Sequence, residues 1–143
     1  MLVAVYGTLK KGFENHHFLK KALFLGEAVS VGKFYLGHAS FPAVVPSKKG
    51  APIAVELYEV SKGTMKVLDR LEGYPSHYNR GKFLFKLNDG KTVEAWLYYY
   101  RHISSWHDWD TSDYPFPWVW EKEGWVPYYS SEVPWLELLK EEK

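Results

Sequence analysis

The chain has 143 residues, the usual length of one domain, and a chain of that size buries enough surface on folding to form a core. Its 18 lysines and arginines nearly balance 17 aspartates and glutamates, so no overall field would attract nucleic acid or an anionic membrane. The absence of cysteine excludes disulfides, thiolate catalysis and cysteine-bound metal. The apolar runs are much shorter than a membrane span and no cleavable leader pattern opens the sequence, so we predict a cytoplasmic protein.

The first part of the chain has the pattern of a strand, a loop and a helix. Residues 2–6 (LVAVY) form a β-branched apolar run that ends at Gly7, as in a buried strand that enters a turn. Apolar residues recur at helical spacing over 16–25, between Asn15 as the candidate N-cap and Gly26 as the candidate stop. We therefore predict a strand over 2–6 and a helix over 16–25.

The next part of the chain predicts two strands separated by a loop. Residues 28–35 mix β-branched and aromatic residues between glycines, which is typical of a strand. Residues 38–46 contain Pro42 and Pro46 and are predicted to form a loop. Residues 53–60 (IAVELYEV) place apolar side chains at every second position, on one face, and predict another strand.

A second helix and a hairpin follow. Residues 61–72 place apolar side chains at every third position, with Ser61 as the candidate N-cap and Gly73 as the stop. The run 80–87 places Phe83, Phe85 and Leu87 on one face, and an Asn-Asp-Gly turn joins it to the run 91–100, which predicts a hairpin. Elements in this order favour an α+β fold, with a small mixed β-sheet rolled towards a barrel and two main flanking helices.

The C-terminal third differs in character, because all seven tryptophans lie from residue 96 onward. Residues 101–134 combine many aromatic residues with four prolines and show no clear period, so we predict an irregular, packed segment. Residues 135–142 (WLELLKEE) predict a short terminal helix. A cluster of exposed tryptophans could also stack on sugars or mediate self-association, and this remains an alternative.

The first candidate site is the turn formed by Tyr6, Gly7, Thr8 and Leu9. A glycine after a strand allows the backbone to turn sharply, and successive backbone N–H groups can then converge on an anion such as a carboxylate. An ordinary strand-to-helix turn has the same local sequence, and neither common phosphate-loop pattern is present. The segment is either an anion-binding loop or a plain turn.

Glu72 is the candidate proton carrier. It lies at the predicted C-terminus of a helix, where the helix dipole disfavours the ionised carboxylate, and burial would raise its pKa further. A carboxyl group with a pKa near neutrality can both accept and return a proton. The alternative is a solvated glutamate at a frayed helix end. Asp69, three residues earlier, could cap the helix, pair with Arg70 or assist Glu72.

Other polar clusters give weaker signals. His102 and His107 lie near three aspartates but show no recognised metal-ligand spacing, so we predict no metal site. Lysines at positions 10, 11, 20 and 21 form two pairs instead of a continuous stripe, so nucleic-acid binding is not expected.

Two motifs taken together carry a resemblance to a known family. VYGTLKKG followed by Asn15 and His16, and then LDRLEGYP followed by Tyr78 and Arg80, resemble the gamma-glutamylcyclotransferase-like family, especially its gamma-glutamylamine cyclotransferase branch. Further similarity in FPAVVP, VELYEV and AWLYYYR extends the likeness over residues 1 to about 101. We therefore predict a single domain over 1–143, with a family-like core and a Trp-rich extension over 102–143. The family fold, a small mixed β-barrel with flanking helices, agrees with the predicted elements.

The resemblance implies an enzyme that cyclises a gamma-glutamyl amine or amino acid to 5-oxoproline and releases the free amine. It assigns the acid/base role to Glu72 and the binding of the glutamyl end to the backbone of Tyr6, Gly7, Thr8 and Leu9. Tyr78 is carried over as a substrate-binding residue, with plain core packing as the alternative. The implied partner is a small-molecule gamma-glutamyl substrate, and no metal or organic cofactor is required. A noncatalytic module that senses a small carboxylate metabolite in the same cavity is the competing interpretation.

Overall fold

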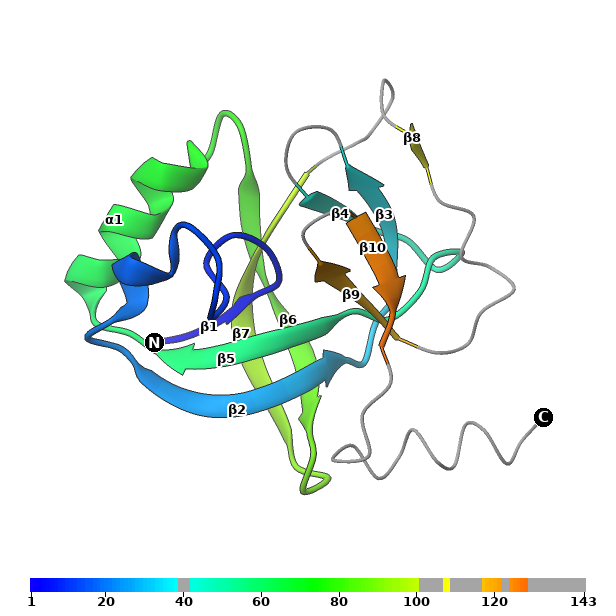
Figure 1. Cartoon of the computed structure of the whole chain (residues 1–143), viewed down its shortest axis with the longest axis horizontal. Helices are drawn as coiled ribbons and strands as arrows, with labels where there is room; N and C mark the ends of the chain where they lie inside the picture. Colours follow the sequence, from blue (N-terminus) through cyan, green and yellow to red (C-terminus); the bar gives the residue numbers. More distant parts are fainter. Residues whose placement is uncertain (39–41, 101–106, 109–116, 122–123, 129–143) are drawn as a thin grey trace.

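The computed structural model describes residues 1–38, 42–100, 107–108, 117–121 and 124–128, and its centre is a closed five-stranded barrel (Figure 1). In neighbour order the barrel strands are β1 (Leu2–Val5), β5 (Ala54–Glu59), β2 (Leu23–Ser30), β6 (Asn79–Leu87) and β7 (Thr92–Tyr99). The β1 and β7 strands pair in parallel, and the other neighbouring pairs are antiparallel. The prediction of an α+β fold built on a small mixed barrel is confirmed.

Apolar side chains pack on both faces of the barrel wall. Leu57, Phe85 and Leu97 belong to a buried cluster to which all five barrel strands contribute residues, and each of the three is fully shielded from solvent. Because successive side chains of a strand point to opposite faces, Val3 and Val5 of β1 belong to a second cluster, which also contains residues of the helices. The end of β1 therefore lies between two cores.

The helix α1 (Lys62–Glu72) confirms the helix predicted over 61–72. The Ser61 side chain accepts a hydrogen bond from the third amide of the helix at 3.1 Å and acts as the N-cap. Gly73 adopts a left-handed φ of 65°, which closes the C-terminus. Met65 and Leu68 are buried against the barrel. Glu72 is thereby fixed as the last residue of the helix.

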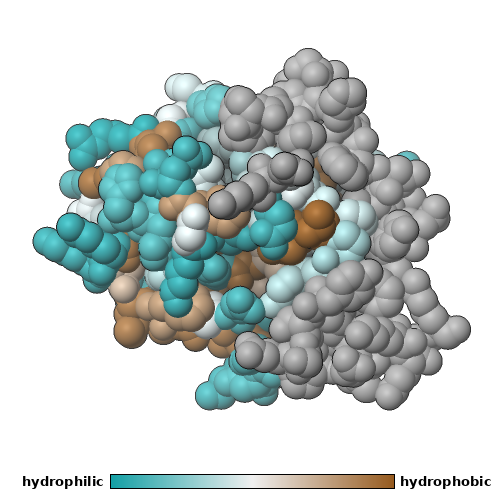
Figure 2. All heavy atoms as spheres, viewed as in Figure 1, coloured by the Kyte–Doolittle hydropathy of each residue, from teal (hydrophilic) through white to brown (hydrophobic). Residues whose placement is uncertain are grey.

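The helix predicted over 16–25 is wrong. A four-residue 3-10 helix, η1 (His16–Leu19), replaces its first part, and β2 begins at Leu23, where it pairs with β5. The apolar residues Leu23, Phe24 and Leu25 are exposed on the strand, and apolar side chains gather along that edge of the molecule in Figure 2. Hydrogen bonding to β5 outweighs the local helical spacing, so one α-helix and one short 3-10 helix flank the described barrel.

The loop predicted over 38–46 contains a strand. A second sheet is formed by β4 (Pro42–Pro46), β3 (Phe34–His38) and β8 (His107–Asp108), in that order. Pro42 and Pro46 occupy the two ends of β4, which is an edge strand of this sheet, and proline is tolerated there because edge positions do not need every backbone N–H. The strand predicted over 28–35 is divided between the end of β2 and the start of β3.

A third sheet lies in the Trp-rich segment. The strands β9 (Trp118–Glu121) and β10 (Gly124–Pro127) pair antiparallel, which corrects the prediction of irregular structure for these residues. They lie with β3 and β4 on the side of the barrel away from α1 (Figure 1). Trp118, Trp120 and Trp125 are buried, so exposed stacking on sugars or on other molecules is wrong for these three. The helix predicted over 135–142 lies outside the described residues.

Candidate active site

A cavity of about 280 Å³ opens where β1 ends. The loop after β1 and the C-terminal end of α1, which the sequence singled out separately, line this same cavity. All six residues predicted as catalytic or substrate-binding are among those that line it, which are Ala4, Val5, Tyr6, Gly7, Thr8, Leu9, Glu14, Asn15, Pro42, Leu71, Glu72, His77, Tyr78 and Tyr98.

The turn after β1 is held in place by the residues that lead into η1. The backbone N–H of Asn15 donates to the Thr8 carbonyl oxygen at 2.9 Å, and the Asn15 side-chain amide donates to Thr8 Oγ1 at 2.9 Å. His16 Nδ1 lies 2.9 Å from the carbonyl oxygen of Leu9. The carbonyl oxygens of the turn are therefore occupied by hydrogen bonds to other groups of the protein.

The backbone N–H groups of the turn differ from its carbonyl groups, because they point to no hydrogen-bond acceptor in the described protein. In the part of the chain that the structure describes, the backbone N–H groups of Gly7, Thr8 and Leu9 donate no hydrogen bond. Three successive unpaired amides beside a cavity can satisfy an anion, because each can donate one hydrogen bond to it. The turn thus has the chemical capacity to bind a carboxylate.

Two contacts explain why Tyr6 and Gly7 stand at the start of the turn. A methyl group at Gly7 would lie 2.7 Å from Cγ of Pro42, so the close approach of β4 requires glycine. The Tyr6 hydroxyl donates to the Tyr98 carbonyl oxygen at 2.8 Å, and its buried ring stacks on Trp125 with a centroid distance of 5.8 Å. Burial raises the pKa of the Tyr6 hydroxyl, which keeps this anchor neutral.

Glu72 lies at the cavity with its side chain only partly covered. Within the described residues, its carboxyl group makes no hydrogen bond and no ion pair with protein. Burial raises the pKa of this carboxyl from 4.5 to about 7, because the charged form loses hydration. Both protonation states are therefore populated near neutral pH, as proton transfer in two directions requires.

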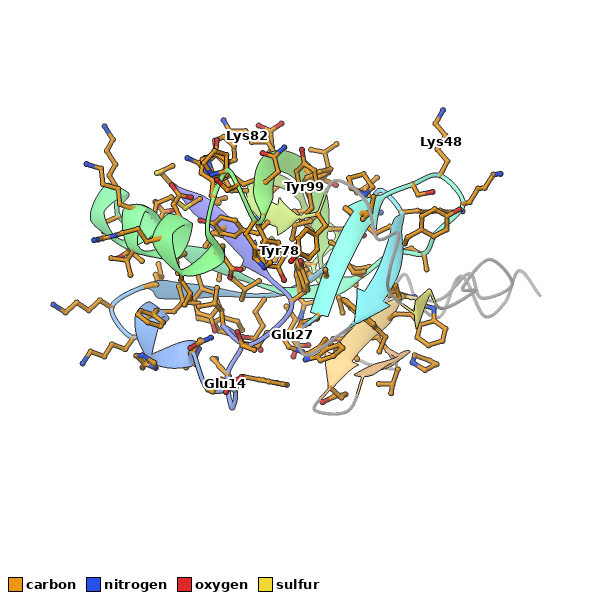
Figure 3. The ribbon with its side chains drawn as sticks, turned by 90° about the horizontal axis from the view of Figure 1, so that it is seen from above. Glu14, Glu27, Lys48, Tyr78, Lys82 and Tyr99 are labelled. Carbon is orange, nitrogen blue, oxygen red and sulfur yellow. The ribbon has the colours of Figure 1, made fainter. Side chains whose placement is uncertain are left out.

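Tyr78 forms part of the cavity wall. Its hydroxyl donates to the carbonyl oxygen of Pro42 at 2.7 Å, and its ring stacks on Tyr100 at a centroid distance of 4.6 Å. In Figure 3 Tyr78 lies in the interior, between α1 and the β3 and β4 strands. The sequence left core packing and cavity lining open as alternatives for Tyr78. In the structure the side chain is buried in the core and also lines the cavity.

Asp69 fixes the last turn of α1 to the barrel. It pairs with Arg80 and not with Arg70, through contacts of 2.9 Å from Nε and 3.3 Å from Nη2. The Tyr98 hydroxyl donates to the same carboxylate at 2.7 Å. The Arg80 guanidinium also lies over the ring of Trp96, 4.4 Å from its centroid. Since Glu72 lies one turn further along the helix, this network sets its position.

Glu14, Pro42 and His77 also line the cavity and were not predicted from the sequence to do so. Glu14 directly precedes Asn15, and His77 directly precedes Tyr78, so proximity to a predicted segment was the available signal. The exposed His77 ring lies 2.6 Å from the Tyr100 hydroxyl through Nε2.

Two further features concern metals and membranes. In the described ranges, no group of three or more His, Asp or Glu side chains is arranged to hold a metal ion. No helix of the same residues has the length and apolar character needed to cross a bilayer.

Comparison with known proteins decides the family. The sequence model of the family described as gamma-glutamyl cyclotransferase, AIG2-like, matches residues 3–125. The chain belongs to this family. The match extends past residue 101 and includes β9, so the family region is longer than the motifs alone indicated. The predicted family and the prediction of an enzyme are confirmed at this level.

Individual relatives agree in sequence and in fold. A relative from Methanocaldococcus jannaschii is 43% identical over 99 residues, which cover 68% of this chain and 82% of that protein. The gamma-glutamylaminecyclotransferase of Rattus norvegicus is 37% identical over 87 residues, covering 54% of this chain and 58% of the relative. The crystal structure of an AIG2-like protein from Mus musculus superimposes with a TM-score of 0.72 at 26% identity, over 90% of this chain and 97% of that one.

Proposed function

We propose that this member of the family cyclises the glutamyl end of a gamma-glutamyl amine or amino acid to 5-oxoproline and releases the free amine. The observation that carries the proposal is the shared cavity, which is lined by a carboxyl group with a pKa of about 7 and by a turn with three unpaired amides. The rat relative, which is named for gamma-glutamylamines, supports an amine as the leaving group.

The proposed reaction uses one proton carrier in two directions. The Glu72 carboxylate accepts a proton from the substrate's α-amine, whose nitrogen attacks the γ-carbonyl carbon of the same molecule. The bond from that carbon to the leaving nitrogen then breaks, and protonated Glu72 returns its proton to this nitrogen. Atoms and charge balance without any change of oxidation state, so the reaction itself calls for no electron carrier.

The amide turn supplies binding and orientation in this scheme. The N–H groups of Gly7, Thr8 and Leu9 hold the glutamyl carboxylate by hydrogen bonds to its oxygens. A flexible glutamyl chain must be bent before its α-amine can reach the γ-carbonyl carbon, and holding it bent removes part of the entropic barrier. Tyr78 closes the cavity beside Glu72 and excludes water from one side of the substrate.

The test is to assay 5-oxoproline after incubation of the purified protein with a panel of gamma-glutamyl amines and amino acids. We expect turnover of at least one member, and a loss of roughly 100-fold or more in kcat for Glu72→Gln with retained fold. Glu94→Gln, at an exposed position of β7, is the matched control and is expected to keep full activity. Saturable binding without product would favour the noncatalytic sensing module, and full activity of Glu72→Gln would refute the mechanism.

A further inference from the structure

Lys10, directly after the amide turn, is a buried lysine that the proposed mechanism does not use. Its side chain is only 6% exposed, which is unusual because a lysine keeps its charge in water unless the protein replaces the lost hydration. Its Nζ donates a hydrogen bond of 2.7 Å to the carbonyl oxygen of Trp120 in β9. Burial lowers the pKa of the Lys10 ammonium, and Glu121, Glu56 and Glu27 act in the opposite direction.

The contact joins parts of the chain that are 110 residues apart. A charge-assisted hydrogen bond in a buried site is stronger than one between neutral groups, so it fixes the distance between the turn and β9. The backbone N–H of Lys10 also donates to the Gly7 carbonyl oxygen at 3.0 Å. A displacement of Lys10 would therefore displace the turn that carries the unpaired amides.

The same sheet contacts the other end of the turn. Trp125 of β10 stacks on Tyr6, and it meets Trp120 in an edge-to-face contact with ring centroids 5.7 Å apart. The Trp125 indole N–H donates to the Gly37 carbonyl oxygen in β3 at 3.1 Å, which ties β10 to the second sheet. The β9 and β10 strands thus hold the turn from both sides, through Tyr6 at its start and Lys10 after its end.

We propose that Lys10 is a positioning residue, which holds the amide turn against β9 so that its N–H groups keep the geometry needed to bind the glutamyl carboxylate. The inference rests on the proposed function for the identity of the ligand, but the mechanical role of Lys10 does not depend on turnover. Because the amides contact the carboxylate, which does not react and is held before and during ring closure, loosening the turn raises KM by more than it lowers kcat.

The test compares Lys10→Met with Lys11→Met. Methionine keeps most of the length of lysine without the charge, and Lys11 is the neighbouring exposed lysine, with its Nζ 3.4 Å from the centroid of the Phe24 ring. Hydrogen exchange is measured at the amides of Phe13 and Asn15, which close the turn onto the carbonyls of Lys10 and Thr8. KM, kcat and the melting temperature are measured on the same proteins.

We expect Lys10→Met to speed exchange at both amides by roughly tenfold and to raise KM by a similar factor, since it removes one charge-assisted hydrogen bond. The pH midpoint of kcat stays unchanged, and Lys11→Met alters neither exchange nor KM. A lower melting temperature without a change in exchange or KM would show a merely structural lysine and overturn the inference. Wild-type values throughout would overturn it as well.

The role of Lys10 can still be decided if the protein shows no turnover or if Lys10→Met does not fold. If the wild-type protein forms no 5-oxoproline, the proposed function fails, while the exchange rates still decide the role of Lys10. If Lys10→Met does not fold, Lys10→Gln replaces it, because glutamine also removes the charge and shortens the side chain by one atom but keeps a polar end. Faster exchange at Phe13 and Asn15 in that variant supports the inference, and unchanged exchange overturns it.

Discussion

Replacing Glu72 by glutamine should stabilise the protein at neutral pH even as it removes the proton carrier. The carboxyl pKa rises from 4.5 to about 7 on folding, and each unit corresponds to about 1.4 kcal/mol, so the ionised side chain costs the fold about 3 kcal/mol at most. Part of the carboxyl still meets water in the cavity, which lowers the expected cost to about 1–3 kcal/mol. Glutamine has nearly the same shape and carries no charge at any pH.

The gain in stability from Glu72→Gln should depend on pH. The folded state of the wild type binds more protons than the unfolded state between pH 4.5 and about 7, so its stability falls as pH rises through that window. The advantage of Glu72→Gln should therefore be near zero below pH 4.5, grow across the window and stay constant above pH 7.

Urea denaturation at several pH values measures this difference directly. Glu94→Gln is the control, because that exposed side chain lies 4.0 Å from Lys82 and its loss should cost at most a few tenths of a kcal/mol at any pH. A stability difference between wild type and Glu72→Gln that does not vary from pH 4 to pH 8 would refute the reasoning, since it would mean that the carboxyl is not desolvated.

Two more substitutions test the scaffold of the site. Asp69→Asn removes the charge that holds Arg80 and should lower stability by about 2–3 kcal/mol in urea denaturation, because it leaves a half-buried guanidinium without its partner. Lys82→Met, which breaks an exposed pair, should cost under about 1 kcal/mol, and an equal loss in both variants would contradict the role given to Asp69. Gly7→Ala brings a methyl group to 2.7 Å from Pro42 and should cost about 1–3 kcal/mol and raise KM. Gly32→Ala, where an added methyl meets nothing within 4 Å, is its control, and wild-type stability and KM in Gly7→Ala would disprove the tight fit.

The elements that the sequence predicted correctly are those with local signals at both ends. The helix that carries Glu72 begins at a Ser61 cap and ends at a left-handed Gly73, and both features depend on neighbouring residues alone. The hairpin of β6 and β7 likewise follows from two strand-forming runs on either side of one turn. The shared cavity was expected because two motifs in the right order carried the family resemblance.

The missed elements depend on contacts between distant residues. The spacing of 16–25 fits a helix, but Leu23 pairs with Glu59 of β5, and no local pattern encodes that partner. The β4 strand begins and ends with proline and is tolerated because it lies at the edge of its sheet. The bond from Lys10 to Trp120 crosses most of the chain, so neither the role of Lys10 nor that of β9 could be inferred from sequence.

The most direct measurement is a titration of the Glu72 carboxyl carbon by NMR in the folded protein, with Glu72→Gln used to assign the signal. We expect a midpoint near pH 7, matched by a rise of kcat/KM through the same pH as the carboxylate form becomes available to accept a proton. A midpoint near 4.5 would contradict a desolvated carboxyl at this cavity, and with it the assignment of Glu72 as the group that carries the proton in both directions.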